Sequence, residues 1–160
     1  MEILPNSKKY EFLLQKFISL LKYQYKISID KIKTIDLNKL SFTISKRTGR
    51  LKYIKYNNIL IATFRYQDGY LIFTKYGLKF ALNLIPYPEN RVVIPKRVSK
   101  FIAEGKSLFS KHIITIDPEL RPESEVIIVD QDDNPVALGK LLMSIKDIKY
   151  FKSGVAVKVR

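Results

Sequence analysis

Apolar and polar residues recur with a helical period near the start of the chain. From residue 8 to about residue 25 the apolar side chains are three or four positions apart, which is the spacing of one face of an α-helix. Asn6 or Ser7 is expected to begin this helix, because either side chain can accept a hydrogen bond from the first free backbone amides. The opposite face is basic, and its lysines could be either simply solvated or in contact with phosphates. Its members are Lys8, Lys16, Lys22 and Lys26.

The pattern then changes to short strand-like runs at residues 40–45, 51–56, 59–64 and 70–74. The segments between them favour tight turns, and they are Arg47-Thr48-Gly49, Asn57-Asn58 and Gln67-Asp68-Gly69. This order predicts an antiparallel meander. Because both faces of residues 59–64 are apolar, at least one face must be covered, either by the first helix or by a second helix predicted over 75–84. Gly77 weakens the first turn of that second helix.

The segment Pro86-Tyr87-Pro88 interrupts this pattern, because proline donates no hydrogen bond to a helix or sheet. We place a domain boundary there, with one domain at residues 1–87 and a second at residues 88–160. In the second domain the polar residues 130–135 predict a hairpin turn. Runs rich in β-branched residues predict a small closed or nearly closed sheet, and they lie at 91–94, 126–129, 136–142 and 154–159.

Shorter elements are predicted between these strands. Residues 95–105 are expected to contain a helix that Pro95 opens and Gly105 closes. Its packed side is predicted to be Val98, Phe101 and Ile102. A strand is predicted at 111–116, a turn at 121–122 and a helix at 145–151. The fold class that follows is α+β, with a helix-plus-meander domain before a small β domain.

The charge of the chain points to a polyanionic partner. The sequence carries 29 Lys and Arg against 15 Asp and Glu, a net charge of +14. Most of it lies in residues 1–80, which hold sixteen basic and five acidic side chains. Nucleic acid is a commoner partner of such proteins than a membrane surface, although a solvated lysine-rich surface also fits.

Several function classes are disfavoured by the residues present. No apolar run reaches the roughly 20 residues that span a bilayer, and the start of the chain lacks a signal-peptide pattern, so a cytoplasmic location is expected. With no cysteine and one histidine, His112, the chain offers no familiar zinc site or nucleophile with its base. We therefore expect no catalytic residue, no metal and no cofactor.

Two motifs that suggest ligands fail at key positions. Gly105-Lys106-Ser107 has the end of a phosphate-binding loop, but Lys100 stands where the first glycine is required. The segment beginning at Asp130 resembles the start of a calcium loop, but Pro135 replaces the glycine and Leu141 the terminal glutamate. A hairpin turn explains that segment better.

The C-terminal motifs carry a resemblance to a known family. The segments RVVIPKRVSKFIAEGKSLFSKHII, DPELRPESEVIIVD, PVALGKLLMS and GVAVKVR resemble, in this order, a PUA domain. Upstream, LLKYQYKI, SFTISKRTGRLKYIKYNNILIATFR and DGYLIFTKYGLKFALNLIPYP resemble the domain that precedes the PUA domain in archaeal tRNA-guanine transglycosylase, the enzyme of archaeosine formation. The resemblance implies a β pseudo-barrel and RNA binding.

The catalytic part of that family is not matched. It is a (β/α) barrel of about 250 residues, with an aspartate nucleophile and a cysteine-rich zinc site. The resemblance therefore predicts a non-catalytic protein that recognises structured RNA, with the acceptor stem or 3′ end of tRNA as the leading choice and rRNA as another. Two further hypotheses for the function remain open. The protein could be an accessory subunit that docks on a catalytic protein partner, or a factor of ribosome assembly or translation.

The resemblance also implies the RNA-contacting residues. It places them on the first helix of the PUA domain, on the loop after it and on the last strand. In the loop, Gly105 is expected to allow close approach, while successive amides and Ser107 donate to phosphate oxygen and Lys106 supplies charge. Arg121 is a reserve candidate. The predicted contacts are Lys96, Arg97, Lys100, Gly105, Lys106, Ser107, Lys111, Lys158 and Arg160.

Overall fold

The computed structural model of the protein describes residues 1–3 and 5–160. It separates into two compact units, Met1–Ile85 and Pro86–Arg160, and each is described by itself. The predicted domain boundary between residues 87 and 88 stays a prediction. Each unit combines helices with one sheet, which confirms the α+β class.

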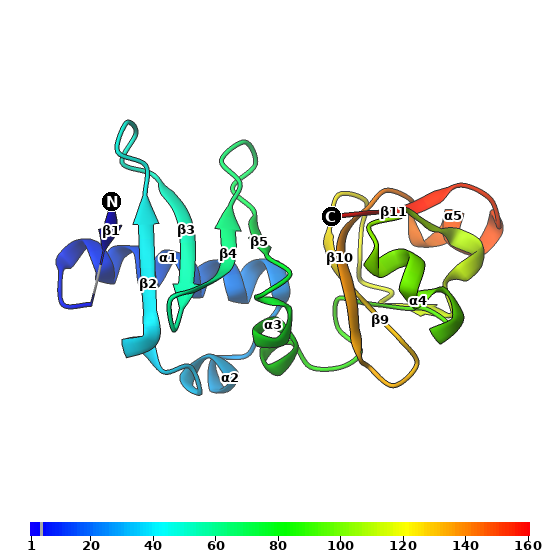
Figure 1. The fold of residues 1–160 in the computed structure, drawn as a ribbon, viewed down its shortest axis with the longest axis horizontal. Helices are drawn as coiled ribbons and strands as arrows, with labels where there is room; N and C mark the ends of the chain where they lie inside the picture. The colour runs from blue at the N-terminus through cyan, green and yellow to red at the C-terminus, as the bar shows by residue number, and fades with distance from the viewer. Residues whose placement is uncertain (4) are drawn as a thin grey trace. The chain divides into compact units, whose positions relative to one another are not determined.

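The first unit is built on a five-stranded antiparallel sheet with the order β1-β2-β3-β4-β5 (Figure 1). Its strands are β1 Glu2–Ile3, β2 Leu40–Ile44, β3 Leu51–Tyr56, β4 Ile59–Phe64 and β5 Leu71–Phe73. The meander is therefore confirmed, and β1 adds an edge strand that was not predicted. Asn57 and Asn58 have φ of 50° and 62°, the left-handed values of a two-residue hairpin turn.

Helix α1, Lys8–Tyr25, covers one face of this sheet. Ser7 caps it, because the Ser7 hydroxyl accepts a hydrogen bond from the Tyr10 amide at 3.1 Å. Tyr10 and Phe17 pack on Phe42, with ring centroids 5.2 and 6.1 Å apart. Two short elements follow, α2 Ile29–Lys33 and η1 Leu37–Lys39. No helix of the described residues is long and apolar enough to cross a membrane.

Lys16 departs from the predicted basic face of α1. Its side-chain nitrogen lies 4.3 Å from the centroid of the Phe64 ring, and the residue is half-buried. Lys8, Lys22 and Lys26 are exposed as expected. The prediction fails at Lys16 because a long aliphatic stem can lie along an apolar surface and leave only its charged end at the edge.

Helix α3, Leu78–Leu84, begins three residues later than predicted. Gly77 precedes the helix, and its amide donates to the Thr74 carbonyl at 3.0 Å. The backbone of β4 passes so close that a β-carbon on Gly77 would lie 1.9 Å from the Ile61 carbonyl oxygen. The glycine is thus required by a tertiary contact, and the helix starts only after that contact.

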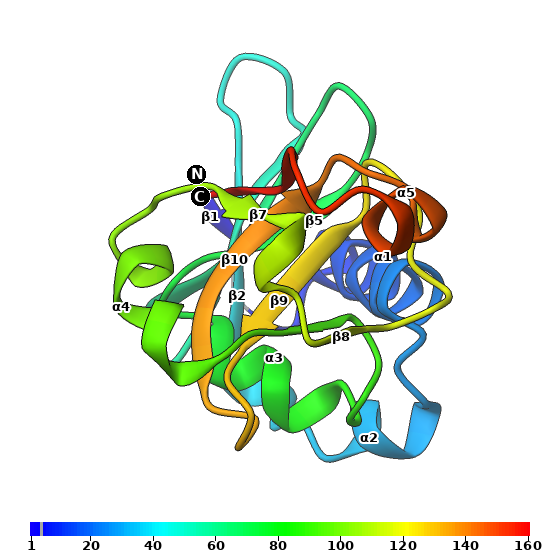
Figure 2. The same cartoon turned by 90° about the vertical axis from the view of Figure 1, so that its right-hand side faces the viewer.

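The second unit is a curled six-stranded sheet with the order β7-β11-β10-β9-β6-β8 (Figure 2). Its strands are β6 Arg91–Val93, β7 Leu108–Phe109, β8 Thr115–Ile116, β9 Glu125–Val129, β10 Pro135–Leu141 and β11 Val155–Val159. Strands β9 and β10 form the predicted hairpin, whereas β6 pairs with β9 in parallel. Helices α4, Lys96–Ala103, and α5, Ile145–Tyr150, pack Ile102 and Ile148 into the core that the sheet encloses.

Two predictions about this unit are wrong in detail. Phe101 is 52% exposed and does not belong to the packed side of α4, which consists of Ile102 and the half-buried Val98. Residues 111–116 are not one strand, because the 3-10 turn η2, Ser110–His112, precedes the two-residue strand β8. The Ser110 hydroxyl donates to the Phe151 carbonyl at 2.7 Å and holds the chain in that turn.

Replacing Gly77 with alanine should destabilise the protein by about 3 kcal/mol, since the added methyl group meets backbone that cannot move aside easily. Urea unfolding followed by circular dichroism measures this. Gly69→Ala is the matched control, because Gly69 has φ of +76° but open space around its β-position. Its cost should be about 1 kcal/mol from conformation alone. Equal losses in the two variants would contradict the close-approach explanation.

Candidate nucleic-acid interface

The loop after α4 is closed by a glycine in the left-handed conformation. Gly105 has φ of +90°, its amide donates to the Ile102 carbonyl at 3.0 Å, and the Lys106 amide donates to the Phe101 carbonyl at 3.2 Å. These two bonds are the usual way in which a glycine ends a helix. They also use both amides, so the expectation that successive amides of this loop donate to a phosphate is wrong for Gly105 and Lys106.

Four of the predicted cationic contacts have side chains that remain available. Among the described residues, none of the predicted contacts Arg97, Lys100, Lys106 or Lys111 forms an ion pair. All four are exposed, as is Ser107. The Lys106 nitrogen lies 5.6 Å from the centroid of the exposed Phe101 ring. The loop therefore presents a cation beside an aromatic surface, and its charge has no carboxylate partner.

Strand pairing brings the end of the chain to this loop. Leu108 of β7 is opposite Val157 of β11, so the residue before it, Ser107, lies beside Lys158. On its other side Lys158 is opposite Lys140, which is paired with Glu123. Ser107 and its neighbour Lys106 thus lie near Lys158. Lys111 lies apart from them, on η2.

Lys96 is already engaged with a carboxylate. Its side chain contacts Asp132 in the β9–β10 turn, and the hydrogen bond from Lys96 to that carboxylate raises the pKa of the Lys96 ammonium group. The same turn is held by Asp130, which accepts from the Asp132 amide at 2.8 Å and from the Asn134 amide at 3.0 Å. The Asn134 side chain adds a third bond, and it is the leading cause that lowers the pKa of Asp130. A turn stabilised by an aspartate is therefore the correct interpretation of this segment.

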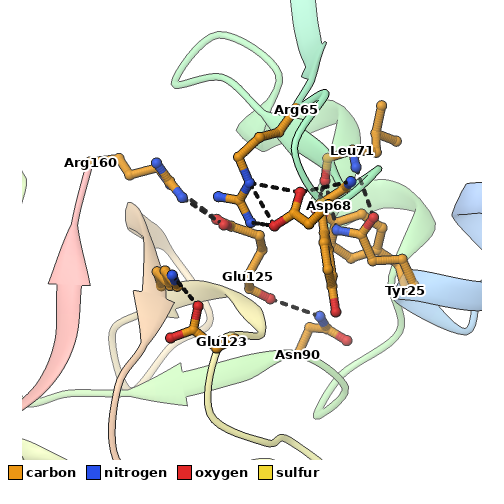
Figure 3. A network of polar contacts seen from close by, with 11 residues as sticks. Tyr25, Arg65, Asp68, Leu71, Asn90, Glu123, Glu125 and Arg160 are labelled. Carbon is orange, nitrogen blue, oxygen red and sulfur yellow. Dashed lines mark hydrogen bonds and ion pairs between the residues drawn. The ribbon is translucent and has the colours of Figure 1, made fainter.

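Arg160 is also engaged, and its partner is buried. Its guanidinium group donates to both carboxylate oxygens of Glu125 at 2.7 and 3.1 Å (Figure 3). Glu125 is only 4% exposed. A buried carboxylate without a partner is costly, so this pair gives Arg160 a structural role that the sequence did not indicate.

Two buried polar residues at the start of β6 were not singled out from the sequence. Arg91 is 1% exposed, and it donates to the Asp133 carboxylate at 2.9 Å and to the Glu89 carbonyl at 3.0 Å. The Asn90 side chain donates to the Glu125 carbonyl at 3.1 Å (Figure 3). No local signal marks either residue as buried, because Asp133 lies 42 positions from Arg91 and Glu125 lies 35 positions from Asn90. Both residues hold the end of the sheet.

The described residues contain no group of three or more His, Cys, Asp or Glu side chains that could hold a metal ion. A pocket of about 560 Å³ lies on another part of the unit, between η2, β8 and α5. Its lining combines four isoleucines with polar and basic side chains, and consists of Ser110, Lys111, Ile113, Ile114, Thr115, Ile116, Ile148, Lys149 and Lys152.

Comparison with known families agrees with this geometry. The PUA domain family matches residues 90–160, where the curled sheet, α4 and the glycine-closed loop lie. Residues 90–160 are a PUA domain. The patch-forming domain C2 of tRNA-guanine transglycosylase matches residues 18–88. The predicted resemblance is confirmed in both parts of the chain.

The chain is similar to archaeal enzymes of tRNA modification. It is 37% identical to the tRNA-guanine(15) transglycosylase of Methanocaldococcus jannaschii over 138 residues, which are 86% of this chain and 21% of that protein. It is 40% identical to the transglycosylase of Pyrococcus furiosus over 114 residues, 71% of this chain and 20% of that protein. The chain therefore spans about a fifth of the length of these relatives.

Two solved structures share the fold along the whole chain. A hypothetical protein from Pyrococcus horikoshii OT3 has a TM-score of 0.71 at 18% identity, with 100% of this chain and 93% of that chain covered. A conserved PUA domain protein from Thermoplasma acidophilum has a TM-score of 0.63 at 16% identity, with 100% and 92% covered. The pseudo-barrel prediction is confirmed by these neighbours.

Arg160→Ala should destabilise the protein, because it leaves Glu125 buried without its bidentate partner. Breaking a buried ion pair costs about 3–5 kcal/mol, and the 38% exposure of the Arg160 side chain reduces the expected loss to about 2 kcal/mol. Lys158→Ala, two positions earlier and exposed, should stay within about 0.5 kcal/mol of the parent. Denaturant melts of the two variants test the difference, and an Arg160→Ala protein as stable as the parent would contradict the structural role.

Proposed function

We propose that the protein binds structured RNA, with the acceptor stem and 3′ end of tRNA as its target, and that it catalyses no reaction itself. The observation that carries the proposal is the surface formed by α4, the loop after it and β11. It combines unpaired exposed cations with a left-handed glycine inside a PUA domain. We call it the α4–β11 surface, and its members are Arg97, Lys100, Gly105, Lys106, Ser107 and Lys158.

The predicted contacts are not equivalent. Lys96 and Arg160 are paired with Asp132 and Glu125, so an RNA phosphate would have to compete with a carboxylate for each of them. Lys111 is exposed but lies on η2. The proposal therefore rests on the α4–β11 surface, and those three residues are proposed only as outlying contacts.

The choice of tRNA rests on the relatives. Both parts of the chain match domains of transglycosylases whose name specifies tRNA, and the curated relatives are archaeal proteins. A role in tRNA modification, in the formation of archaeosine, is accordingly part of the proposal. Because the chain matches only the C2 and PUA parts, we assign it recognition and not the exchange of the base. RNA of the ribosome is the alternative target within the same class.

The chemistry of the surface favours contact with the RNA backbone. Double-helical RNA has a deep and narrow major groove, so a protein recognises its phosphates, 2′-hydroxyl groups and shape more than its base sequence. Lysine and arginine supply charge to phosphates, and the Ser107 hydroxyl can donate to a 2′-hydroxyl or phosphate oxygen. If about five cations neutralise phosphates, the log of the binding constant should fall with log salt at a slope of about −4.

A second candidate function is docking on a catalytic protein. The pocket between η2, β8 and α5 favours it, because it exposes the apolar side chain of Ile114 within a rim of lysines. Exposed apolar surface with a polar rim is typical of protein interfaces. The two functions are compatible, since a subunit that binds tRNA can present it to an enzyme. A factor of ribosome assembly or translation is the remaining alternative, and sequencing of RNA cross-linked in cells separates it from tRNA recognition.

Lys106→Glu should weaken binding to a tRNA transcript by at least ~1 kcal/mol, which is about fivefold, because it replaces attraction at one phosphate with repulsion. The salt slope should become shallower by about 1, and unrelated tRNA sequences should lose similar affinity. Lys146→Glu makes the same charge change at an exposed position of α5 and is the control. Fluorescence anisotropy at several salt concentrations measures both. If Lys106→Glu and the parent bind equally, the RNA contacts lie elsewhere.

Ile114→Asp should abolish retention of a catalytic protein partner while leaving tRNA affinity within twofold, because the substitution puts a charge among the apolar side chains of the pocket and removes no cation of the α4–β11 surface. Affinity purification of the tagged protein from its native cells, with and without ribonuclease, provides the measurement. Recovery of RNA alone, with no stoichiometric protein in either sample, would count against docking.

A further inference from the structure

Two hairpin tips of the first unit have the same local structure. Residues 46–49 join β2 to β3 and residues 66–69 join β4 to β5. In each, the residue before the tip and the one after it are joined by a backbone bond, Ser45 to Arg50 at 2.9 Å and Arg65 to Tyr70 at 2.8 Å. Each tip ends in a glycine of positive φ, Gly49 or Gly69. The tips project from the same end of the sheet (Figures 1 and 2).

The two tips are joined by a cation stacked on an aromatic ring. The guanidinium carbon of Arg50 lies 3.8 Å from the centroid of the Tyr66 ring, a close cation–π contact. Tyr66 is nevertheless 60% exposed. Lys52 stands over the Tyr53 ring at 4.7 Å. We call this group the hairpin-tip patch, and its members are Lys46, Arg47, Arg50, Lys52 and Tyr66.

The cations of the hairpin-tip patch have no carboxylate partner among the described residues. The first unit has five carboxylate side chains against sixteen Lys and Arg. Four of these carboxylates are paired with cations outside the patch, and the pairs are Glu2–Lys55, Asp30–Lys33, Asp36–Lys39 and Asp68–Arg65. The fifth, Glu11, lies on α1.

Arg65 and Arg50 are held by different kinds of partner. Arg65 is held by Asp68 within its own tip at 2.6 to 2.9 Å (Figure 3), so it stabilises the loop. Arg50 is instead oriented by an aromatic ring, which leaves its N–H groups without a carboxylate to bind. Four uncompensated cations within seven positions repel one another, which favours binding of an external polyanion.

We infer that the hairpin-tip patch is a second RNA-binding surface, which contacts phosphates of the same RNA that the PUA domain binds. The inference rests on the proposed function and extends it to the other unit. Lys46, Arg47 and Lys52 supply charge to the phosphates, Arg50 donates bidentate hydrogen bonds to one of them, and Tyr66 is a positioning residue that orients Arg50. Contacts of this kind are independent of base sequence.

The test replaces Lys46, Arg47 and Arg50 with glutamine in the full chain. We expect binding to a tRNA transcript to weaken at least tenfold at physiological salt, and the salt slope to become shallower by about 2, because several phosphate contacts are lost. The control carries Lys31→Gln, Lys75→Gln and Lys79→Gln. These lysines are exposed on or beside α2 and α3, at the opposite end of the same sheet, and the net charge changes equally.

The control variant should bind within twofold of the parent. Loss in both variants would show that only net charge matters. Unchanged affinity of the hairpin-tip variant would show that the patch does not contact the RNA. Either result overturns the inference. Measuring Lys106→Glu in the same assay distinguishes failure of the hairpin-tip inference from failure of the proposed function. If Lys106→Glu binds normally while the hairpin-tip variant is weak, the patch stands and the α4–β11 surface fails. A parent protein that binds no RNA overturns both.

Single substitutions at Tyr66 test the positioning role. Tyr66→Phe keeps an aromatic face for Arg50 and should bind RNA like the parent. Tyr66→Leu removes the cation–π contact and should weaken binding about threefold, with no further effect once Arg50 is replaced by glutamine. Thermal melting shows that both proteins are folded. Equal affinity of Tyr66→Leu and the parent would exclude this role.

Discussion

The second unit depends on the complete burial of β9. All five residues from Glu125 to Val129 are buried, and β9 lies between β10 and the parallel strand β6. Because β9 is covered on both faces, the rest of the 75-residue unit has to pack around it. Glu125, the polar residue at the start of β9, then needs hydrogen-bond partners inside the protein. Arg160 supplies them for the Glu125 carboxylate, while Asn90 binds the Glu125 carbonyl. The Arg160–Glu125 pair in this unit therefore joins the end of the chain to β9.

Elements determined by neighbouring residues were predictable from the sequence. The Ser7 cap and the β9–β10 hairpin depend on side chains within a few positions of the backbone groups that they bind, and the Asn57-Asn58 turn depends on the left-handed conformation of its own two residues. The start of α3 was not predictable in this way, because it is determined by the approach of β4 to Gly77. Phe101 has the spacing of a buried residue but faces outward, since α4 uses only a narrow side for packing.

The same distinction applies to the candidate site. The charge of a lysine and the conformation of Gly105 are local properties, and both could be inferred from the order of residues. Whether a cation is free is a tertiary property, because the partners of Lys96 and Arg160 lie 36 and 35 positions away. The hairpin-tip patch was missed for a related reason. Arg50 and Tyr66 belong to different hairpins, and only the folded meander brings them into contact.

The distribution of charge between the units bears on how such a protein selects RNA. The first unit has a net charge of +11, whereas the second has thirteen basic and ten acidic side chains. Fields from exposed charges fade within about 8–10 Å at physiological salt, so each surface attracts mainly the phosphates that come close to it. An RNA that reaches both surfaces combines their affinities, because the second contact then forms at a high effective concentration. If both proposed surfaces bind RNA, they favour a large folded RNA over short fragments of the same sequence, without any contact to its bases.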